Sequence, residues 1–589
     1  MTTSSDNRFQ PNVIIPVLPE EIDHFDNEAK RFRSGDLDAA EFRAFRLRQG
    51  VYGQRQPDNQ MMRVKVPLGR MTPDQLESLG RIARDYTPLK RGHITTRENV
   101  QYHFLNLDDA AEVMRTLGST GLGSREACGN TVRNVTSCPL TGVCPEEVFD
   151  PSPYAVAYVR NFVRRDFTNN MPRKWKTAFS GCTHDWVMTA IHDIGFHAVI
   201  REIDGVERKG FRIVVGGGTS IQPLIAQELY EFVPVEDFLK VSEACLRVFN
   251  AADELRKNKM KARVKVLINR IGIDAFREMV EKVMEEELAD VTYDLDELSA
   301  GEYEDPTPPP PADYPPFPND DPAFERWLGS NVIGQKQDGY SAVFIKLRLG
   351  NVTDEQFFQL ADISRDLAGS IRMTLRQDMT LQWVPNNALH VLYEKLVAVG
   401  MAEPGANELS DIVSCPGTES CALGITSSQG LAGNLWDALS DYKSHDELAR
   451  NIRINISGCP DGCGQHHLGN IGFHGAAIRV GSAQVPAYEV YIGGSQIKPV
   501  RIGQHLRVKV PSKRIEEAIK LIVDDYVEHR NSGEVFNDYV DRIGAATYED
   551  LLKPVSTVPE LGRETIHYYI DWNRDVLYKV ERGEGECAA

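Results

Sequence analysis

The sequence lacks the features of exported, membrane-spanning and nucleic-acid-binding proteins. Ten cysteines in 589 residues are too few for a disulfide framework. No apolar run reaches the roughly 18 residues that a membrane span needs, and the N-terminus lacks the basic and apolar stretches of an export signal. A net charge of −19 argues against general binding to nucleic acid or anionic membranes. We therefore expect a cytoplasmic protein in a reducing environment.

A dinucleotide-binding fingerprint is also absent. The glycine-rich segments 214–220 and 491–496 lack the G-x-G-x-x-G spacing that cradles a pyrophosphate. Both occupy equivalent positions in an internal repeat, which accounts for their similarity. We do not expect the chain to bind flavin or nicotinamide by itself.

What the chain does contain is the same pattern twice. The segment from Arg63 resembles the segment from Phe344, each with a strand, a threonine N-cap (Thr72 or Thr353) and an amphipathic helix. Further on, three cysteines of the first half each precede a cysteine of the second half by 277 residues. These pairs are Cys138 and Cys415, Cys144 and Cys421, and Cys182 and Cys459. A duplication predicts two α/β halves related by a pseudo-twofold axis, with a ligand cleft between them.

The predicted fold is therefore α/β (α+β), internally duplicated, with ferredoxin-like half-domains and two larger α/β domains. An acidic, proline-rich stretch near residue 310 separates the halves as a semi-rigid linker. The predicted units are an N-terminal arm (1–60), a first half-domain (61–145), a first α/β domain (146–300), the linker (301–330), a second half-domain (331–408), a second α/β domain (409–545) and a C-terminal extension (546–589).

Four cysteines in two tight pairs are the strongest functional signal. Cys415 and Cys421 are spaced C-x5-C, and Cys459 and Cys463 are spaced C-x3-C, each pair among Gly and Pro. Four thiolates suit zinc or an iron–sulfur cluster, and the position of the pairs deep in a large chain favours the cluster. Four buried cysteines without a metal are the third interpretation. In the first half Trp186 stands at the position of Cys463, so we expect Cys138, Cys144 and Cys182 to bind no metal.

With the duplication and both cysteine pairs, residues 52 to 544 resemble the sirohaem-dependent sulfite/nitrite reductase family. The resemblance implies a [4Fe–4S] cluster on Cys415, Cys421, Cys459 and Cys463, with Cys463 also bridging to the sirohaem iron. It implies that Arg97, Arg133, Lys174 and Lys176 bind the substrate anion and relay protons. Asp461 stands where the family often carries asparagine, which puts local sirohaem contacts in doubt.

Lys176 separates the two substrates of this family. The resemblance implies lysine at this position in sulfite reductases and asparagine in plant-type nitrite reductases. Sulfite is a dianion with three oxygens and nitrite a monoanion with two, so an additional cation favours sulfite. We predict a ferredoxin-dependent assimilatory sulfite reductase, with nitrite reduction as the alternative and a non-catalytic iron–sulfur or zinc protein as the alternative of another class.

Two smaller expectations complete the interpretation. The resemblance implies that Tyr52 and Cys128 lie near the sirohaem, where some ferredoxin-dependent sulfite reductases have a covalent Tyr–Cys bond. Electrons must come from outside the chain, from ferredoxin or a separate flavoprotein, and the basic segment 256–265 is a candidate docking face. We expect a monomer with no membrane or nucleic-acid partner.

Overall fold

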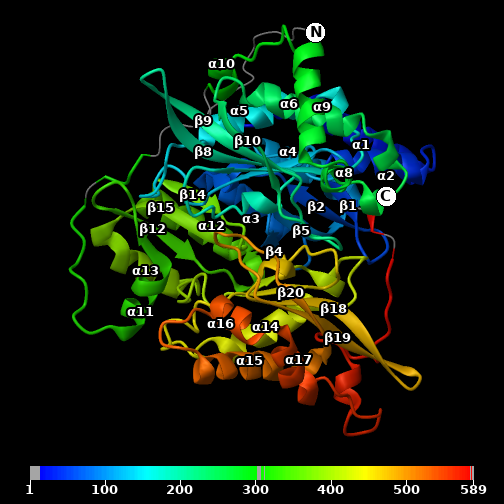
Figure 1. Ribbon diagram of the computed structural model, residues 1–589, viewed down its shortest axis with the longest axis vertical. Helices are drawn as coiled ribbons and strands as arrows, with labels where there is room; N and C mark the ends of the chain where they lie inside the picture. The colour runs from blue at the N-terminus through cyan, green and yellow to red at the C-terminus, as the bar shows by residue number, and fades with distance from the viewer. Residues whose placement is uncertain (1–12, 301–306, 311, 584, 587–589) are drawn as a thin grey trace.

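The computed structural model describes residues 13–300, 307–310, 312–583 and 585–586. Parts of the predicted arm, linker and C-terminal extension therefore lie outside the described residues. Four five-stranded sheets organise the chain, two in the ferredoxin-like half-domains and two in the larger α/β units (Figure 1). Within the described residues, no helix has both the length and the apolar character needed to cross a membrane.

The two half-domains exchange short strands. The first sheet has the order β1-β2-β5-β4-β13 and the second β11-β12-β15-β14-β3, so each takes its last strand from the other half. The first comprises β1 (Val51–Gly53), β2 (Asn59–Val64), β5 (Val100–Asn106), β4 (Arg91–Ile94) and β13 (Asn351–Thr353). The second comprises β11 (Val332–Gly334), β12 (Tyr340–Ile345), β15 (Met379–Pro385), β14 (Ser370–Met373) and β3 (Arg70–Met71). The exchange ties the two halves into one unit.

Two equivalent helices pack together between these sheets. Helices α3 (Pro73–Tyr86) and α12 (Asp354–Leu367) each begin with a capping box, in which Thr72 or Thr353 accepts from the backbone N–H of a glutamine three residues on. This confirms the two predicted N-caps. One hydrophobic core runs through both half-domains, and it includes α4 (Ala110–Gly118), α11 (Pro322–Asn331) and α13 (Leu389–Ala398).

The two larger sheets repeat one topology, which confirms the duplicated α/β fold. In each, three parallel strands are followed by two antiparallel ones. The first sheet comprises β6 (Val132–Ser137), β7 (Trp175–Ser180), β8 (Ile194–Ile203), β9 (Val206–Val215) and β10 (Gln227–Pro234). The second comprises β16 (Val413–Ser414), β17 (Ile454–Ser457), β18 (Ile471–Val480), β19 (Ala483–Ile492) and β20 (Gln504–Pro511).

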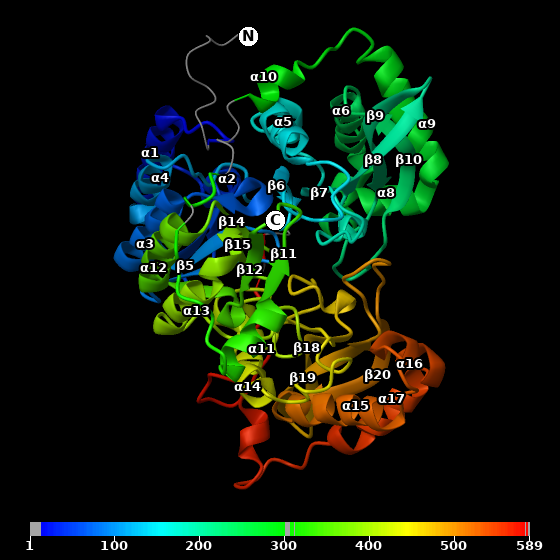
Figure 2. The same ribbon diagram turned by 90° about the vertical axis from the view of Figure 1, so that its left-hand side faces the viewer.

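Helices cover one face of each larger sheet, and the two units form separate lobes beside the paired half-domains (Figure 2). The helices of the first lobe are α5 (Ser152–Phe162), α6 (Phe238–Asn250), α8 (Val264–Ile271), α9 (Ile273–Glu286) and α10 (Leu295–Ser299). Those of the second are α14 (Ser428–Leu439), α15 (Ile515–His529), α16 (Phe536–Ile543) and α17 (Ala545–Leu552).

Two segments differ from simple expectation. The N-terminal region carries α1 (Pro19–Ser34) and α2 (Ala39–Arg48), and the first sheet already begins at Val51. The strongly helical stretch 251–288 is divided into α7 (Asp253–Arg256), a 3-10 turn, α8 and α9. Gly272 separates the last two helices with φ of 86°, a left-handed conformation that glycine adopts without strain.

Candidate functional site

The two cysteine pairs lie on loops that pack against each other. Strands β16 and β17 are parallel neighbours, so the loops after them, with Cys415 and Cys459, leave the same edge of the sheet. The backbone N–H of Gly458 donates to the Cys415 sulfur at 3.2 Å. A Cβ on Gly458 would lie 2.7 Å from the Cα of Gly417. Only glycines allow this approach, which brings the pairs together.

The four cysteines lie close enough to influence one another's ionisation. Burial raises the pKa of the Cys459 thiol, and Cys463, Cys415 and Cys421 each raise it further. Cys459 is buried, whereas Cys463 is exposed. Four thiols gathered in this way resist ionisation unless a metal centre compensates their charge, so the donor set fits a thiolate-bound cluster.

A C-terminal strap, residues 571–583, holds the Cys415–Cys421 loop in place. It follows a 3-10 turn at Ile566–Tyr569, within the predicted C-terminal extension. Side chains and backbone of the strap bond to the loop and to the residues just after it. The contacts are Arg574 to the Thr418 carbonyl at 2.8 Å, Tyr578 to the Ile425 carbonyl at 2.8 Å, Gly583 N–H to the Ala422 carbonyl at 2.9 Å and Ser427 N–H to Asp571 at 2.8 Å.

The strap also provides a positively charged partner for Asp461. Its carboxylate lies 3.7 Å from the guanidinium of Arg582 on the strap and 3.6 Å from the Cys459 sulfur. An ion pair at this distance offsets the negative charge beside the cysteine loop. No sequence pattern connects Asp461 with Arg582, because only tertiary structure brings them together.

Opposite the cysteine loop lies a turn of the first half that carries Arg97. The hydroxyl of Thr96 donates to the Cys463 carbonyl at 2.9 Å. The Arg97 guanidinium donates to the carbonyls of Asn134 (2.8 Å) and Thr177 (3.1 Å), while its Nε is buried without a hydrogen-bond partner among the described residues. A buried cation with a spare donor fits an anionic ligand.

The other predicted cations gather around Arg97. Arg133 lies on β6, Lys176 lies at the start of the neighbouring strand β7, and Lys174 lies just before that strand. Burial lowers the pKa of Lys176 well below its usual value, and Arg97, Arg263 and Lys174 lower it further. Burial also lowers the pKa of Arg97, to about 9, and Arg133 contributes to that decrease. The four cations therefore form one electrostatic group.

Sequence analysis missed two members of this group. It assigned Arg263 and Lys265 to an exposed docking face, but both are buried, so that part of the assignment was wrong. Arg263 forms a buried bidentate ion pair with Asp193 at 2.8 and 2.7 Å. Both residues belong to a basic segment whose composition is typical of a solvent-exposed face. At the start of α8, however, their side chains point into the protein.

Lys265 positions the loop that touches the cysteine site. Its ammonium donates to the carbonyls of Gly218 (3.2 Å), Thr219 (2.7 Å) and Gln222 (2.5 Å). The Thr219 hydroxyl in turn lies 3.5 Å from the Gly462 carbonyl, next to Cys463. Burial lowers the pKa of Lys265 to about 7.

The three cysteines of the first half form a compact, buried group. The sulfurs of Cys138 and Cys182 are 4.0 Å apart, and all three side chains lie in a hydrophobic cluster. Interactions with the Cys138 and Cys144 thiols lower the pKa of the Cys182 thiol. Trp186, at the position of Cys463, packs on Phe344 with ring centroids 6.1 Å apart.

Tyr52 and Cys128 belong to one small hydrophobic cluster together with Leu47 and Met61. Cys128 is fully buried, and its sulfur accepts a hydrogen bond from Arg63 at 3.2 Å.

Profiles of two protein domains match most of this chain, each of them twice. The profile of the nitrite and sulphite reductase 4Fe-4S domain matches residues 128–288 and 405–558. The nitrite/sulfite reductase ferredoxin-like half domain matches residues 52–119 and 333–399. The chain belongs to the nitrite and sulphite reductase family. It is thus an oxidoreductase, and its cofactors are the sirohaem and [4Fe–4S] cluster that this family uses.

Named relatives within the family include enzymes for both substrates. A sulfite reductase [ferredoxin] of Mycolicibacterium paratuberculosis is 30% identical over 490 residues, covering 82% of each chain. An assimilatory ferredoxin-dependent nitrite reductase of Haloferax mediterranei is 27% identical over 524 residues, covering 86% of each. The structure of the Mycobacterium tuberculosis NirA protein matches with a TM-score of 0.73 and 27% identity over 91% of this chain and 98% of that one. Relatives at this level of similarity leave both substrates open.

Proposed function

We propose that this reductase converts sulfite to sulfide with six electrons taken from ferredoxin. The observation that carries the proposal is the group of buried and half-buried cations, Arg97, Arg133, Lys174 and Lys176, next to the Cys463 loop. Cations that repel one another in a partly desolvated place are stabilised when an anion binds among them. Both the carboxylates of sirohaem and an oxyanion substrate meet that need.

The cofactor ligands follow from the donor set. Cys415, Cys421, Cys459 and Cys463 would hold the cluster, and Cys463, the exposed one, would also bind the sirohaem iron. When bound, the two centres supply the electrons for the reduction. The glycine contacts between the loops and the C-terminal strap hold the four thiols in position.

The cations bind the substrate and deliver protons. Arg97 and Arg133 stay charged and orient the oxygens of the anion, since guanidinium groups form paired hydrogen bonds to oxyanions. Each oxygen leaves as water, so protons must reach it. Lys176 is the better donor because burial and its cationic neighbours lower its pKa, which eases transfer of its proton.

Lys176 also supports sulfite over nitrite. Its ammonium adds a third point of positive charge beside Arg97 and Lys174, which favours the dianion with three oxygens. Asparagine, expected in the plant-type nitrite reductases, offers a neutral amide instead. We propose nitrite as the poorer substrate.

A Lys176→Asn variant tests this assignment. We expect the ratio of kcat/KM for sulfite to kcat/KM for nitrite to fall by roughly tenfold or more, the scale of one hydrogen bond to a charged group. The control is Arg453→Asn, which changes the equivalent position of the second half. The two variants are compared only if both show the visible spectrum of the unchanged enzyme. An unchanged ratio in Lys176→Asn, or an equal fall in the control, would contradict the role of Lys176.

We propose that ferredoxin docks on Lys257, Lys259 and Lys261, the exposed part of the basic segment. These lysines surround Met260, whose side chain is 58% exposed, a combination suited to an acidic partner. Replacing all three by Glu should raise the KM for reduced ferredoxin by at least about tenfold. Activity with a small chemical reductant should stay unchanged, and Lys282→Glu on α9 serves as the control. Equal effects of both variants would exclude this face.

A further inference from the structure

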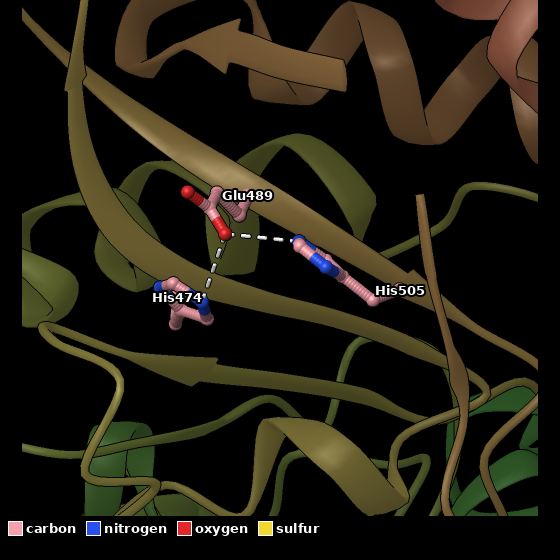
Figure 3. Close-up of side chains that lie close together, drawn as sticks. All are labelled: His474, Glu489 and His505. Carbon is pink, nitrogen blue, oxygen red and sulfur yellow. Dashed lines mark ion pairs between the residues drawn. The ribbon is translucent and has the colours of Figure 1, made fainter. Parts of the chain in front are cut away.

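Three potential metal ligands lie on the open face of the second large sheet. His474 on β18 is paired with Glu489 on β19, and His505 on β20 is paired with Tyr491, two residues from Glu489. Their neighbours Phe473 and Tyr488 point the other way, into the core beneath the helices. Figure 3 shows Glu489 between the two imidazoles, with its carboxylate directed at both.

The distances among the three side chains suit a metal ion. The Oε2 atom of Glu489 lies 3.3 Å from Nε2 of His474 and 2.9 Å from Nε2 of His505, and one ligand atom from each residue lies within 4.8 Å of the others. Ligands at about 2.0–2.2 Å from a tetrahedral zinc are themselves roughly 3.3–3.6 Å apart. Rotation of the side chains, above all of the exposed His505, would bring the three ligand atoms to these separations.

The hydrogen bonding of His474 directs its lone pair toward Glu489. Its Nδ1 lies 3.2 Å from the Gly475 carbonyl, so Nδ1 carries the proton in the neutral ring and Nε2 is left as an acceptor. An acceptor nitrogen facing a carboxylate oxygen requires a cation, either a proton or a metal. A backbone carbonyl on the far nitrogen is the usual support of a metal-binding histidine.

Charge and access also suit a divalent cation. When His474 carries a second proton, on Nε2, its hydrogen bond, with further contributions from Lys509, lowers the pKa of Glu489 to about 2. A metal ion in the place of that proton would keep the carboxylate ionised in the same way. Lys509 contacts the other oxygen, Oε1, at 3.2 Å, so Oε2 remains directed at the histidines. The His474 side chain is 8% exposed and that of His505 is 48% exposed, which leaves one side open to solvent.

The equivalent positions in the first large sheet do not carry three metal ligands, because one of them is an arginine. His197, Arg212 and Glu228 occupy the equivalent places. Arg212 pairs with Glu228 at 2.5 Å, and Nε2 of His197 lies 2.6 Å from the Thr189 hydroxyl. There the guanidinium supplies the positive charge. In the second copy a carboxylate replaces that guanidinium and an imidazole replaces the carboxylate.

We propose that His474, Glu489 and His505 bind a divalent metal ion of the zinc class at a site separate from the cluster cysteines. Two imidazoles and one carboxylate are a donor set that Zn²⁺, Co²⁺ and Ni²⁺ accept. The fourth position faces solvent and takes water. The ion links β18, β19 and β20 across the open face of the sheet.

Zinc binding to the holoenzyme tests the site directly. The protein is dialysed against a chelator that leaves its iron content unchanged, then titrated with Zn²⁺ by calorimetry, and zinc and iron per chain are measured. We expect one zinc per chain at micromolar or lower concentration. Glu489→Gln and His505→Gln should each weaken binding by at least about tenfold, with iron content and visible spectrum unchanged.

Two control variants make the test specific. His184→Gln removes one member of a His–Glu pair at 2.9 Å on the first copy, and Glu228→Gln changes the position equivalent to His505. Both should retain the zinc. Failure of the wild-type protein to take up zinc, or retention of zinc by Glu489→Gln and His505→Gln, would overturn the proposal. Zinc uptake accompanied by loss of iron would also overturn it, because the metal would then occupy the cysteines.

Discussion

The two copies of the duplicated chain share a backbone but differ in what surrounds their equivalent arginines. In the first copy Arg97 bonds to backbone carbonyls, including that of the neutral residue Asn134. In the second copy Arg376 contacts Asp411, which occupies the position of Asn134, with its Nε 3.4 Å from the carboxylate. A carboxylate neutralises the guanidinium, whereas an amide leaves it available to a ligand. We propose that this neighbouring residue is one reason why the first copy, and not the second, binds the substrate anion.

For the cysteines it is the second copy, not the first, that keeps the set needed to bind a ligand. The first copy has three buried thiols in an apolar cluster, closed by Trp186. The second copy has a fourth cysteine, Cys463, which is exposed and contacts Thr96 of the first copy through its carbonyl. We infer that the first copy contributes the cations and the second the thiolates of one shared site.

The largest expected effect comes from replacing one cysteine in each copy by serine. Cys463→Ser should abolish reductase activity and the sirohaem absorption, because serine is a poor ligand for both metal centres. Cys182→Ser in the first copy should retain full iron and sulfide content and activity, with stability lowered by about 1–3 kcal/mol for a buried hydroxyl. Metal analysis and the visible spectrum measure both variants. Loss of iron from Cys182→Ser would show that the first copy binds metal as well.

The arginines allow a sharper comparison with a smaller effect. Arg97→Gln should lower kcat/KM for sulfite by about 10²- to 10³-fold with the melting temperature little changed, as for loss of one charge-stabilising donor. Arg376→Gln should do the reverse, since it leaves Asp411 buried without its partner and destabilises the protein by about 3–5 kcal/mol. Kinetics and thermal unfolding on the same preparations separate the two. Matching profiles for both variants would refute the assignment of the anion site to the first copy alone.

The smallest expected effect concerns Tyr52 and Cys128 of the first copy. The second copy has no equivalent of this pair, since Gly405 stands 277 residues after Cys128. We predict a covalent bond between them, since both belong to the same hydrophobic cluster. Forming this thioether is a two-electron oxidation in which an external oxidant such as dioxygen takes up the two hydrogen atoms. Peptide mapping of active enzyme should therefore find a linked peptide lighter by two hydrogen atoms than the two separate peptides together. Cys128→Ala should abolish the linkage and change turnover modestly. Unlinked peptides from fully active enzyme would exclude the bond.

Much of the fold followed from local patterns in the sequence. The capping boxes at Thr72 and Thr353 depend on residues three positions apart, so they are visible without a structure. The duplication also appears directly, as a constant offset between cysteines. The exchange of β3 and β13 between half-domains was not predictable, because strands of two or three residues carry almost no pattern and their partners lie far away in the chain.

The candidate site divides in the same way. The cysteine spacing and the resemblance identified four thiols and four cations by residue number. Arg263 and Lys265 were misassigned to the surface, because a basic run has the same composition whether it is solvated or turned inward by a helix. The strap from Asp571 to Gly583 was missed because its hydrogen bonds are mostly to backbone carbonyls, which every residue possesses.

By itself the sequence determined the donor atoms, the repeat and the family, since these depend on residue identity and spacing. Tertiary structure alone decided which charges are buried, which arginine is neutralised and which loops meet. It placed Arg582 beside Asp461 and Thr96 against Cys463, contacts between segments more than 100 residues apart. Burial and partner choice set the electrostatic energy of a charged group, and both depend on the packing of the whole chain.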